Sequence, residues 1–200
     1  MRVPPDACPP PLPGAPDAGL ATCSFPPGAC LHEFFEAHAA ATPDAVALSF
    51  GGQRVTYAEL NAQANRLAHH LRALGVGPET LVALCLDRSP ALLTALLAVL
   101  KAGGAYVPLD PDAPAERLTL IVADAASPVL LTQTSLGEKI SVSAATVFCL
   151  DRDLPTLAAL PADNPAPLAT ATSAAYVLHL RLHRRAQRRR RHPSQRRPPF

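Results

Sequence analysis

Apolar residues recur at intervals of three and four between Thr56 and Gly75, which is the clearest helical pattern in the chain. The apolar stripe consists of Tyr57, Leu60, Ala64, Leu67, Leu71 and Leu74. Thr56 and Glu59 have the spacing of a capping box, in which the threonine hydroxyl accepts the backbone N–H of Glu59 and the carboxylate reaches back to Thr56. Gly75 suits the position just after the last turn. The pattern predicts an amphipathic helix. Its adjacent His69 and His70 point in different directions, so we expect both at the surface and not as a ligand pair.

Three other stretches have helical spacing. One begins at Leu31 and ends at Thr42-Pro43-Asp44. A second has Ser89 as its cap and Pro90 at its first position, and it runs to Lys101. Its leucines leave almost no polar face, and at about twelve residues it is too short to span a bilayer, so we expect a buried helix. The third covers residues 114–124.

Strand patterns separate these helices. The predicted strands are 45–50, 53–56, 81–86, 105–108, 129–132 and 148–150, and the first two flank Gly51-Gly52 as a hairpin. The continuous apolar run Leu81–Leu86 is typical of a strand covered on both faces. Strands that alternate with helices indicate an α/β fold, a layered, largely parallel sheet with flanking helices. Residues 151–172 are rich in Pro, Ala and Asp and are interpreted as a loop.

Composition divides the chain into three parts. Nine of the 23 prolines lie in residues 1–30, which we interpret as a disordered leader or linker; a Pro-rich ligand for a recognition domain is the alternative. Residues 31–178 are expected to form the folded part, and residues 179–200 a disordered Arg-rich tail. No secretory signal and no apolar run of membrane-spanning length are visible, so no membrane partner is expected.

The formal net charge of +2 conceals a sharp split. Nine of the 18 Lys and Arg lie between Arg181 and Arg197, and no acidic residue follows Asp163. The remaining nine basic residues face all 16 acidic ones, so residues 1–178 carry a formal charge of −7.

The five cysteines follow no CxxC or Cys/His spacing that would suggest zinc. Cys85 lies inside an apolar strand, where a reduced, buried thiol is expected and a reactive one is the alternative. This cysteine usage favours a reducing, cytoplasmic compartment.

No pattern in the chain is catalytic by itself. There is no nucleophile elbow, no HExxH and no GxGxxG, so we expect no catalytic, cofactor-binding or metal-ligating residue. Gly103-Gly104 follows a helix, whereas anions bind where a helix begins, so these glycines are interpreted as a C-cap. Asp110 precedes Pro111 and is expected to begin an Asx-turn.

Two segments nevertheless resemble a known family. Val55–Leu60 resembles the first core motif of the adenylation domains of nonribosomal peptide synthetases, and Leu100–Pro111 resembles the second. The resemblance extends over about residues 30–177. Residues that match the two motifs are Thr56, Tyr57, Glu59, Leu60, Lys101, Gly103, Gly104, Tyr106, Pro108, Asp110 and Pro111. In the family these motifs are structural: they brace the N-terminal subdomain.

The resemblance implies the incomplete N-terminal subdomain of an adenylate-forming fold. It also implies an enzyme that uses ATP and Mg²⁺ to convert an amino acid to its aminoacyl-adenylate. The aminoacyl group then passes to the phosphopantetheine thiol of a carrier protein.

The family's next motif is a Gly-, Ser- and Thr-rich loop that wraps the ATP phosphates, and Ala175-Tyr176-Val177 resembles the strand that introduces it. The segment His179–Phe200 instead contains nine Arg and no glycine. Written in permitted codons and read one base later, His179–Ala186 becomes Thr-Ser-Gly-Ser-Thr-Gly-Ala-Pro, and residues 188–192 become Gly-Val-Val-Val-Thr. Gln187 does not match, because in the shifted frame it becomes Asn or Ser where the family has Lys.

We therefore interpret the tail as the product of a frameshift near Leu178. The expected protein is a fragment of an amino-acid-activating adenylation domain that is inactive alone. One alternative is a non-catalytic protein whose Arg-rich tail binds nucleic acid, a partner we do not expect. Another is a split enzyme completed by a second chain. The activated amino acid is not specified.

Overall fold

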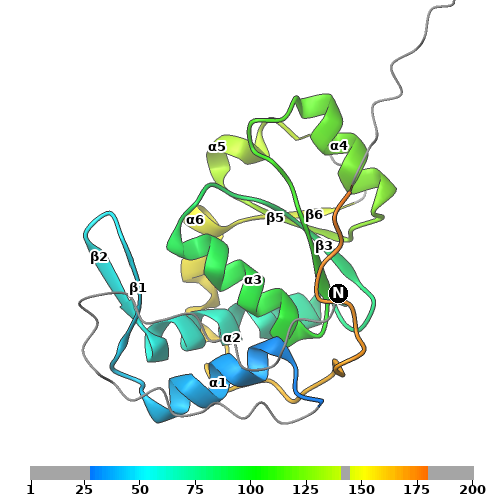
Figure 1. Cartoon of the computed structure of the whole chain (residues 1–200). Coiled ribbons are helices and arrows are strands. Elements are labelled where there is room, and N and C mark those ends of the chain that lie inside the picture. The colour runs from blue at the N-terminus through cyan, green and yellow to red at the C-terminus, as the bar shows by residue number, and fades with distance from the viewer. Residues whose placement is uncertain (1–27, 141–144, 180–200) are drawn as a thin grey trace, which may run out of the picture.

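The structure is a computed structural model that describes residues 28–140 and 145–179. Its helices and strands alternate along the chain, as the hydrophobic pattern predicts (Figure 1). The elements are α1 (Leu31–Ala41), β1 (Val46–Phe50), β2 (Gln53–Thr56), α2 (Tyr57–Ala73), β3 (Leu81–Cys85), α3 (Pro90–Ala102), β4 (Ala105–Pro108), α4 (Ala115–Asp124), β5 (Val129–Thr132), α5 (Thr134–Gly137), β6 (Thr146–Cys149), α6 (Leu150–Asp153) and the 3-10 helix η1 (Leu154–Ala159).

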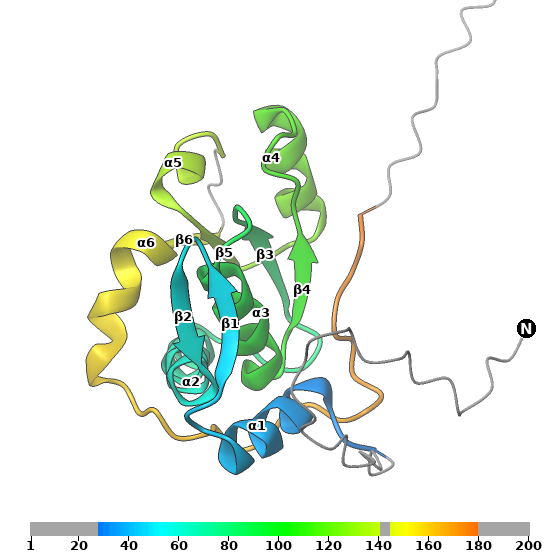
Figure 2. The same ribbon diagram turned by 60° about the vertical axis from the view of Figure 1, so that its left-hand side comes forward.

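Four of the strands form a parallel sheet in the order β4-β3-β5-β6. The predicted α/β class with a parallel sheet is thereby confirmed. Strands β1 and β2 pair antiparallel in a separate hairpin that projects beside the N-terminal end of α2 (Figure 2). The central strand β3 is buried along nearly its whole length, as the apolar run Leu81–Leu86 predicts.

Each face of the parallel sheet carries its own hydrophobic core because successive side chains of a strand point to opposite faces. Val82 and Leu84 of β3 pack with α2 and α3, and the same core takes in Phe148 of β6. Ala83 and Cys85 point the other way and pack with α4. The sheet is therefore covered on both faces, which is the usual condition of parallel sheets.

Helix α2 forms as predicted, including its capping box. The Thr56 backbone N–H donates to Glu59 Oε2 at 2.9 Å, and the Glu59 N–H donates to Thr56 Oγ1 at 3.2 Å. Gly75 follows the helix at a φ of +87°. The two histidines differ from their prediction, because both are half-buried: the His70 ring lies 5.0 Å from that of Phe148.

Helix α3 departs from its prediction as a wholly buried helix. Its fully enclosed face consists mainly of small residues and one lysine, namely Thr94, Ala95, Ala98, Val99, Lys101 and Ala102. The leucines flank this face and are only partly covered, and Leu93 is 43% exposed. Ala68 of α2 lies in the same core as Ala95 and Ala98 of α3, and these small side chains let the two helices pack closely, so the leucines are left on the sides of the contact.

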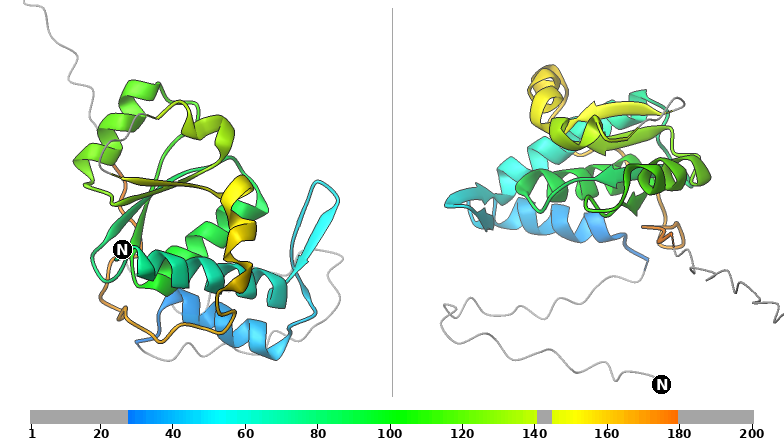
Figure 3. Two further views of the ribbon diagram at one scale, coloured as in Figure 1. Left: turned by 180° about the vertical axis from the view of Figure 1, so that it is seen from behind. Right: turned by 90° about the horizontal axis from the view of Figure 1, so that it is seen from above.

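The region predicted as the loop 151–172 begins instead with α6 and η1. Leu150 and Leu157 are buried against the α2 and α3 core, and their packing stabilises these short helices. Residues 160–174, called the strap below, then run past α1 and α2 and turn toward β4 (Figure 3). In the described part of the chain, no helix is long and apolar enough to cross a membrane.

Candidate functional site

Residues of the first motif fasten α2 to the segments before it. The Tyr57 N–H donates to the Ala45 carbonyl at 3.0 Å, and the Tyr57 ring lies 5.7 Å from Phe35 and 4.6 Å from His38, both on α1. Leu60 is buried at 3% exposure. The motif therefore joins α1, the hairpin and α2.

The second motif begins with a fully buried cation. The side chain of Lys101 is wholly inaccessible, and its Nζ donates to Glu36 Oε1 and, at 3.2 Å, to Asn164 Oδ1. Burial lowers the pKa of Lys101, while the hydrogen bond and charge of Glu36 oppose that shift. Because a buried charge is costly unless it is paired, Lys101 ties α3 to α1 and to the strap.

The two glycines of the motif permit close packing. Gly103 has a φ of +94° at the end of α3, which confirms its interpretation as a C-cap. A Cβ on Gly104 would lie 2.8 Å from Val76 Cγ1 and 3.0 Å from the Thr80 carbonyl oxygen. Both distances are too short, so only glycine fits at position 104 without a shift of its neighbours.

Tyr106 and the residues after it form the edge of the sheet. Tyr106 makes a parallel bridge to Tyr176, and the two rings stack at 5.7 Å. Pro108 ends β4, where an edge position tolerates the missing N–H. Asp110 Oδ1 accepts the Asp112 N–H at 3.1 Å, which is the predicted Asx-turn, and Pro111 lies within it.

Polar side chains also gather at the carboxyl ends of β3, β5 and β6, the edge at which parallel sheets bind ligands. Gln133 Nε2 donates to Asp87 Oδ2 at 2.7 Å, and the Asp151 carboxylate accepts the Thr134 N–H and hydroxyl at 3.0–3.1 Å. These groups satisfy one another. Among the described residues, no group of His, Cys, Asp and Glu side chains could hold a metal ion.

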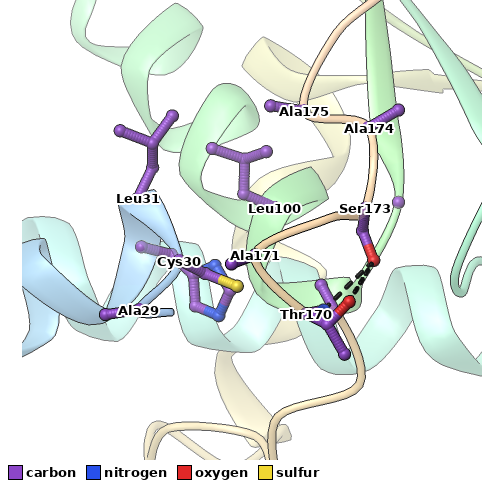
Figure 4. A pocket seen from close by; sticks show the side chains of 12 residues that line it. Ala29, Cys30, Leu31, Leu100, Thr170, Ala171, Ser173, Ala174 and Ala175 are labelled. Carbon is purple, nitrogen blue, oxygen red and sulfur yellow. Dashed lines mark hydrogen bonds between the residues drawn. The ribbon is translucent and has the colours of Figure 1, made fainter. Parts of the chain in front are cut away.

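A small hollow of about 180 Å³ lies between the start of α1 and the strap (Figure 4). The Thr170 N–H donates to Ser173 Oγ at 3.1 Å across one side of it, and the nearby Cys30 thiol has its pKa raised by burial. His32 also lines it, and burial lowers the pKa of that ring. The volume of this hollow is smaller than the roughly 300–1,000 Å³ that is usual for small-molecule sites.

Three polar residues that hold the strap were not predicted from the sequence. Arg72 Nη2 donates to the carbonyls of Lys101 and Ala166, each at 2.7 Å, and Asn65 Nδ2 donates to the Ala162 carbonyl and to Asn164 Oδ1. Asn65 is completely buried on the apolar face of α2. In the sequence, the contact is indicated only by Asn65, a polar residue beside the apolar stripe of α2. No sequence pattern indicates that Asn164 lies here.

Comparisons with known proteins agree with this architecture. The family model described as AMP-binding enzyme matches residues 35–193. The chain is 51% identical over 150 residues to a linear gramicidin synthase of Brevibacillus parabrevis, and 47% identical over 152 residues to chondramide synthase of Chondromyces crocatus. These alignments cover 75% and 74% of the chain but only 3% and 4% of those relatives.

Solved structures give the same result. The nonribosomal peptide synthetase FmoA3 bound to alpha-methyl-L-serine-AMP superimposes with a TM-score of 0.70 at 32% identity, over 75% of this chain and 17% of that one. The N-terminal subdomain of Klebsiella oxytoca NpsA superimposes with a TM-score of 0.65 at 25% identity, over 73% of this chain and 36% of that one. The chain therefore belongs to the AMP-binding enzyme family, and it corresponds to the N-terminal part of a nonribosomal peptide synthetase adenylation domain.

Proposed function

We propose that these residues come from a domain that activates an amino acid with ATP. The observation that carries the proposal is that the second motif lies on α3 and the edge strand β4, and that Tyr176 pairs with Tyr106 of this strand. FmoA3, which shares this fold, has been solved with an aminoacyl-adenylate and with an ATP analogue. In the proposed reaction, the carboxylate of the amino acid attacks the α-phosphorus of ATP, giving the aminoacyl-adenylate and pyrophosphate. A carrier-protein thiol then takes the aminoacyl group and releases AMP.

The residues of the two motifs contribute no catalytic group to this reaction. Lys101 is enclosed and paired, Asp110 is engaged in a turn, and the glycines permit packing. The proposed role of the motif residues is to brace the subdomain. ATP and Mg²⁺ are expected to be held by other segments of the intact domain. The free thiols of Cys30, Cys85 and Cys149 suit the reducing cytoplasm, the compartment we propose.

We further propose that the 200-residue chain is inactive alone, because its sequence after Leu178 contains no phosphate-binding loop in frame. That loop supplies much of the positioning and charge stabilisation of adenylate formation. We expect no amino-acid-dependent exchange of labelled pyrophosphate into ATP with a mixture of all proteinogenic amino acids. An intact adenylation domain serves as the positive control. Exchange above the enzyme-free background would refute the proposed inactivity.

Sequencing the gene across codons 170–200 tests the frameshift directly. The proposal expects a reading frame shifted by one base that encodes the glycine-rich loop and, downstream, the other adenylation motifs. A shifted frame without those motifs would contradict it. Residues 179–200 are the basis of the proposal; all but His179 lie outside the described residues.

The nine arginines of the tail favour a second candidate, a nucleic-acid-binding protein on an adenylation scaffold. That candidate predicts binding to duplex DNA at physiological ionic strength, with affinity that falls steeply as salt rises. We expect no such binding. A titration of labelled duplex DNA at two salt concentrations, with a chain ending at Leu178 as control, distinguishes the two functions. A split enzyme, the third candidate, would recover exchange only after addition of a chain that carries the remaining motifs.

A further inference from the structure

The second motif runs side by side, and in the same direction, with residues 164–177, which comprise most of the strap and the three residues after it. Lys101 contacts Asn164, Gly103 lies against Leu168, and Tyr106 pairs with Tyr176. The three contacts follow the same order along both segments, and the later segment lies more than 60 residues further along the chain. Figure 2, in which β4 is labelled, shows the orange end of this segment running beside that strand.

Asn164 is the first point of attachment. Its Oδ1 accepts hydrogen bonds from three donors: Asn61 Nδ2 at 2.9 Å, Asn65 Nδ2 at 2.9 Å and Lys101 Nζ at 3.2 Å. Two of the donors are fully buried side chains. If the strap moved away, a buried ammonium and a buried amide would each lose a partner, which is costly in a low-dielectric interior.

Arg72 strengthens the same attachment from α2. Its guanidinium bridges the carbonyl of Lys101, at the end of α3, and the carbonyl of Ala166, in the strap. Both distances are 2.7 Å, as expected of hydrogen bonds from a charged donor. Arg72 thus holds the motif and the strap at a fixed separation.

Gly103 sets the closest approach. A Cβ at this position would lie 3.0 Å from Leu168 Cβ and 3.7 Å from the Ala169 nitrogen. Glycine is therefore required here twice, once for its φ of +94° and once for the nearness of the strap.

Tyr106 receives the end of the segment. Its N–H donates to the Ala175 carbonyl at 3.1 Å, and its carbonyl accepts the Val177 N–H at 2.9 Å. The bridge is parallel, so the chain passes Tyr176 toward the carboxyl ends of the strands. Ligands of open parallel sheets bind at that edge.

We propose that the second motif is a template that sets the register and direction of residues 164–177, and that Asn164 is the positioning residue on the strap. The template directs the chain at Val177 toward the ligand-binding edge of the sheet. That the ATP-phosphate loop follows this point in the intact domain rests on the proposed function above, whereas the placement of Tyr176 rests on its pairing with Tyr106.

The experiment measures the exchange of individual backbone amides in the full chain, by NMR, for wild type, Asn164→Ala and Asn164→Asp. Asn164→Ala removes the acceptor shared by three donors, and we expect the Val177 amide to exchange about tenfold faster or more relative to the β3 amides. Asn164→Asp keeps an acceptor, so protection of Val177 should be retained.

Tyrosine signals give a second readout. The chain has no Trp and three Tyr, so in a Tyr57→Phe background the near-ultraviolet circular dichroism reports largely on the Tyr106–Tyr176 pair. We expect this signal to fall in Asn164→Ala and to persist in Asn164→Asp.

Thr56→Ala is the matched control, because it removes a capping bond of α2 without touching the strap. It should speed exchange without singling out Val177. The proposal is overturned if Asn164→Ala leaves Val177 as protected as in wild type, or if it speeds all amides equally, as a purely structural loss would. If Asn164→Ala fails to fold, Arg72→Met, which removes the guanidinium that joins the motif to the strap, is tested instead, with the same expected change in the protection of Val177. If the chain catalysed pyrophosphate exchange, the proposed inactivity would be wrong, but the amide-exchange test of the register would be unaffected.

Discussion

Replacing Gly104 with alanine is expected to lower the free energy of unfolding by about 2 kcal/mol. The new Cβ would lie 2.8 Å from Val76 Cγ1 and 3.0 Å from the Thr80 carbonyl oxygen, and each must retreat by roughly half an ångström to reach ordinary contact. The Thr80 carbonyl cannot turn away freely, because it accepts the Ala105 N–H at 2.9 Å. Overpacking of this kind costs up to about 3 kcal/mol, and the reduced entropy of the unfolded chain returns up to about 1 kcal/mol.

Urea denaturation followed by far-ultraviolet circular dichroism measures the change, with Gly77→Ala as the matched control. A Cβ on Gly77 would meet nothing within 4 Å, and Gly77 does not have a positive φ, so this variant should gain about 0.4–1 kcal/mol. The steric reasoning is refuted if Gly104→Ala unfolds within about 0.5 kcal/mol of wild type, or if Gly77→Ala loses as much as Gly104→Ala.

Two further predictions follow from buried titratable groups. Burial raises the pKa of Cys85 to about 11, so its thiol should resist alkylation at pH 8 until the chain unfolds, whereas half-exposed Cys30 should react. Peptide mapping that finds Cys85 alkylated in the folded chain would contradict this prediction. Burial lowers the pKa of His32 below 6.5, although the charges of Glu36 and Glu33 oppose this shift. The stability that the neutral ring provides is therefore present above pH 6.5 and is lost as the pH falls. His32→Gln should therefore lose less stability than wild type as the pH falls below 6.5, and equal losses in urea midpoints would show that the ring protonates freely in the fold.

Local signals were sufficient for most elements of the fold. The capping box and the 3–4 spacing of α2, the hairpin at Gly51-Gly52 and the apolar run of β3 depend on residues close in sequence, and all three formed as predicted. The face that α3 buries was not predictable in this way. Leucines and alanines are both apolar, and only the close approach of α2 decided that the alanines lie inside.

The candidate site likewise has features that the sequence predicted and features that it did not. The Asx-turn at Asp110 and the C-cap at Gly103 are local, and both were predicted. The roles of Arg72 and Asn164 were not, because their partners lie 29 to 103 residues away along the chain. Residues 151–159 likewise form helices because Leu150 and Leu157 find a distant core to pack against.

The sequence by itself determined the alternation of helices and strands, the two motifs that mark the family, and the charge split between an acidic body and an Arg-rich tail. These properties depend on residue type and short spacing. Only the tertiary structure decided the strand order and the attachment of the strap to Lys101, Gly103 and Tyr106. A buried ammonium must be paired wherever the fold encloses it, and which distant side chain pairs with it depends on how the chain returns to that place.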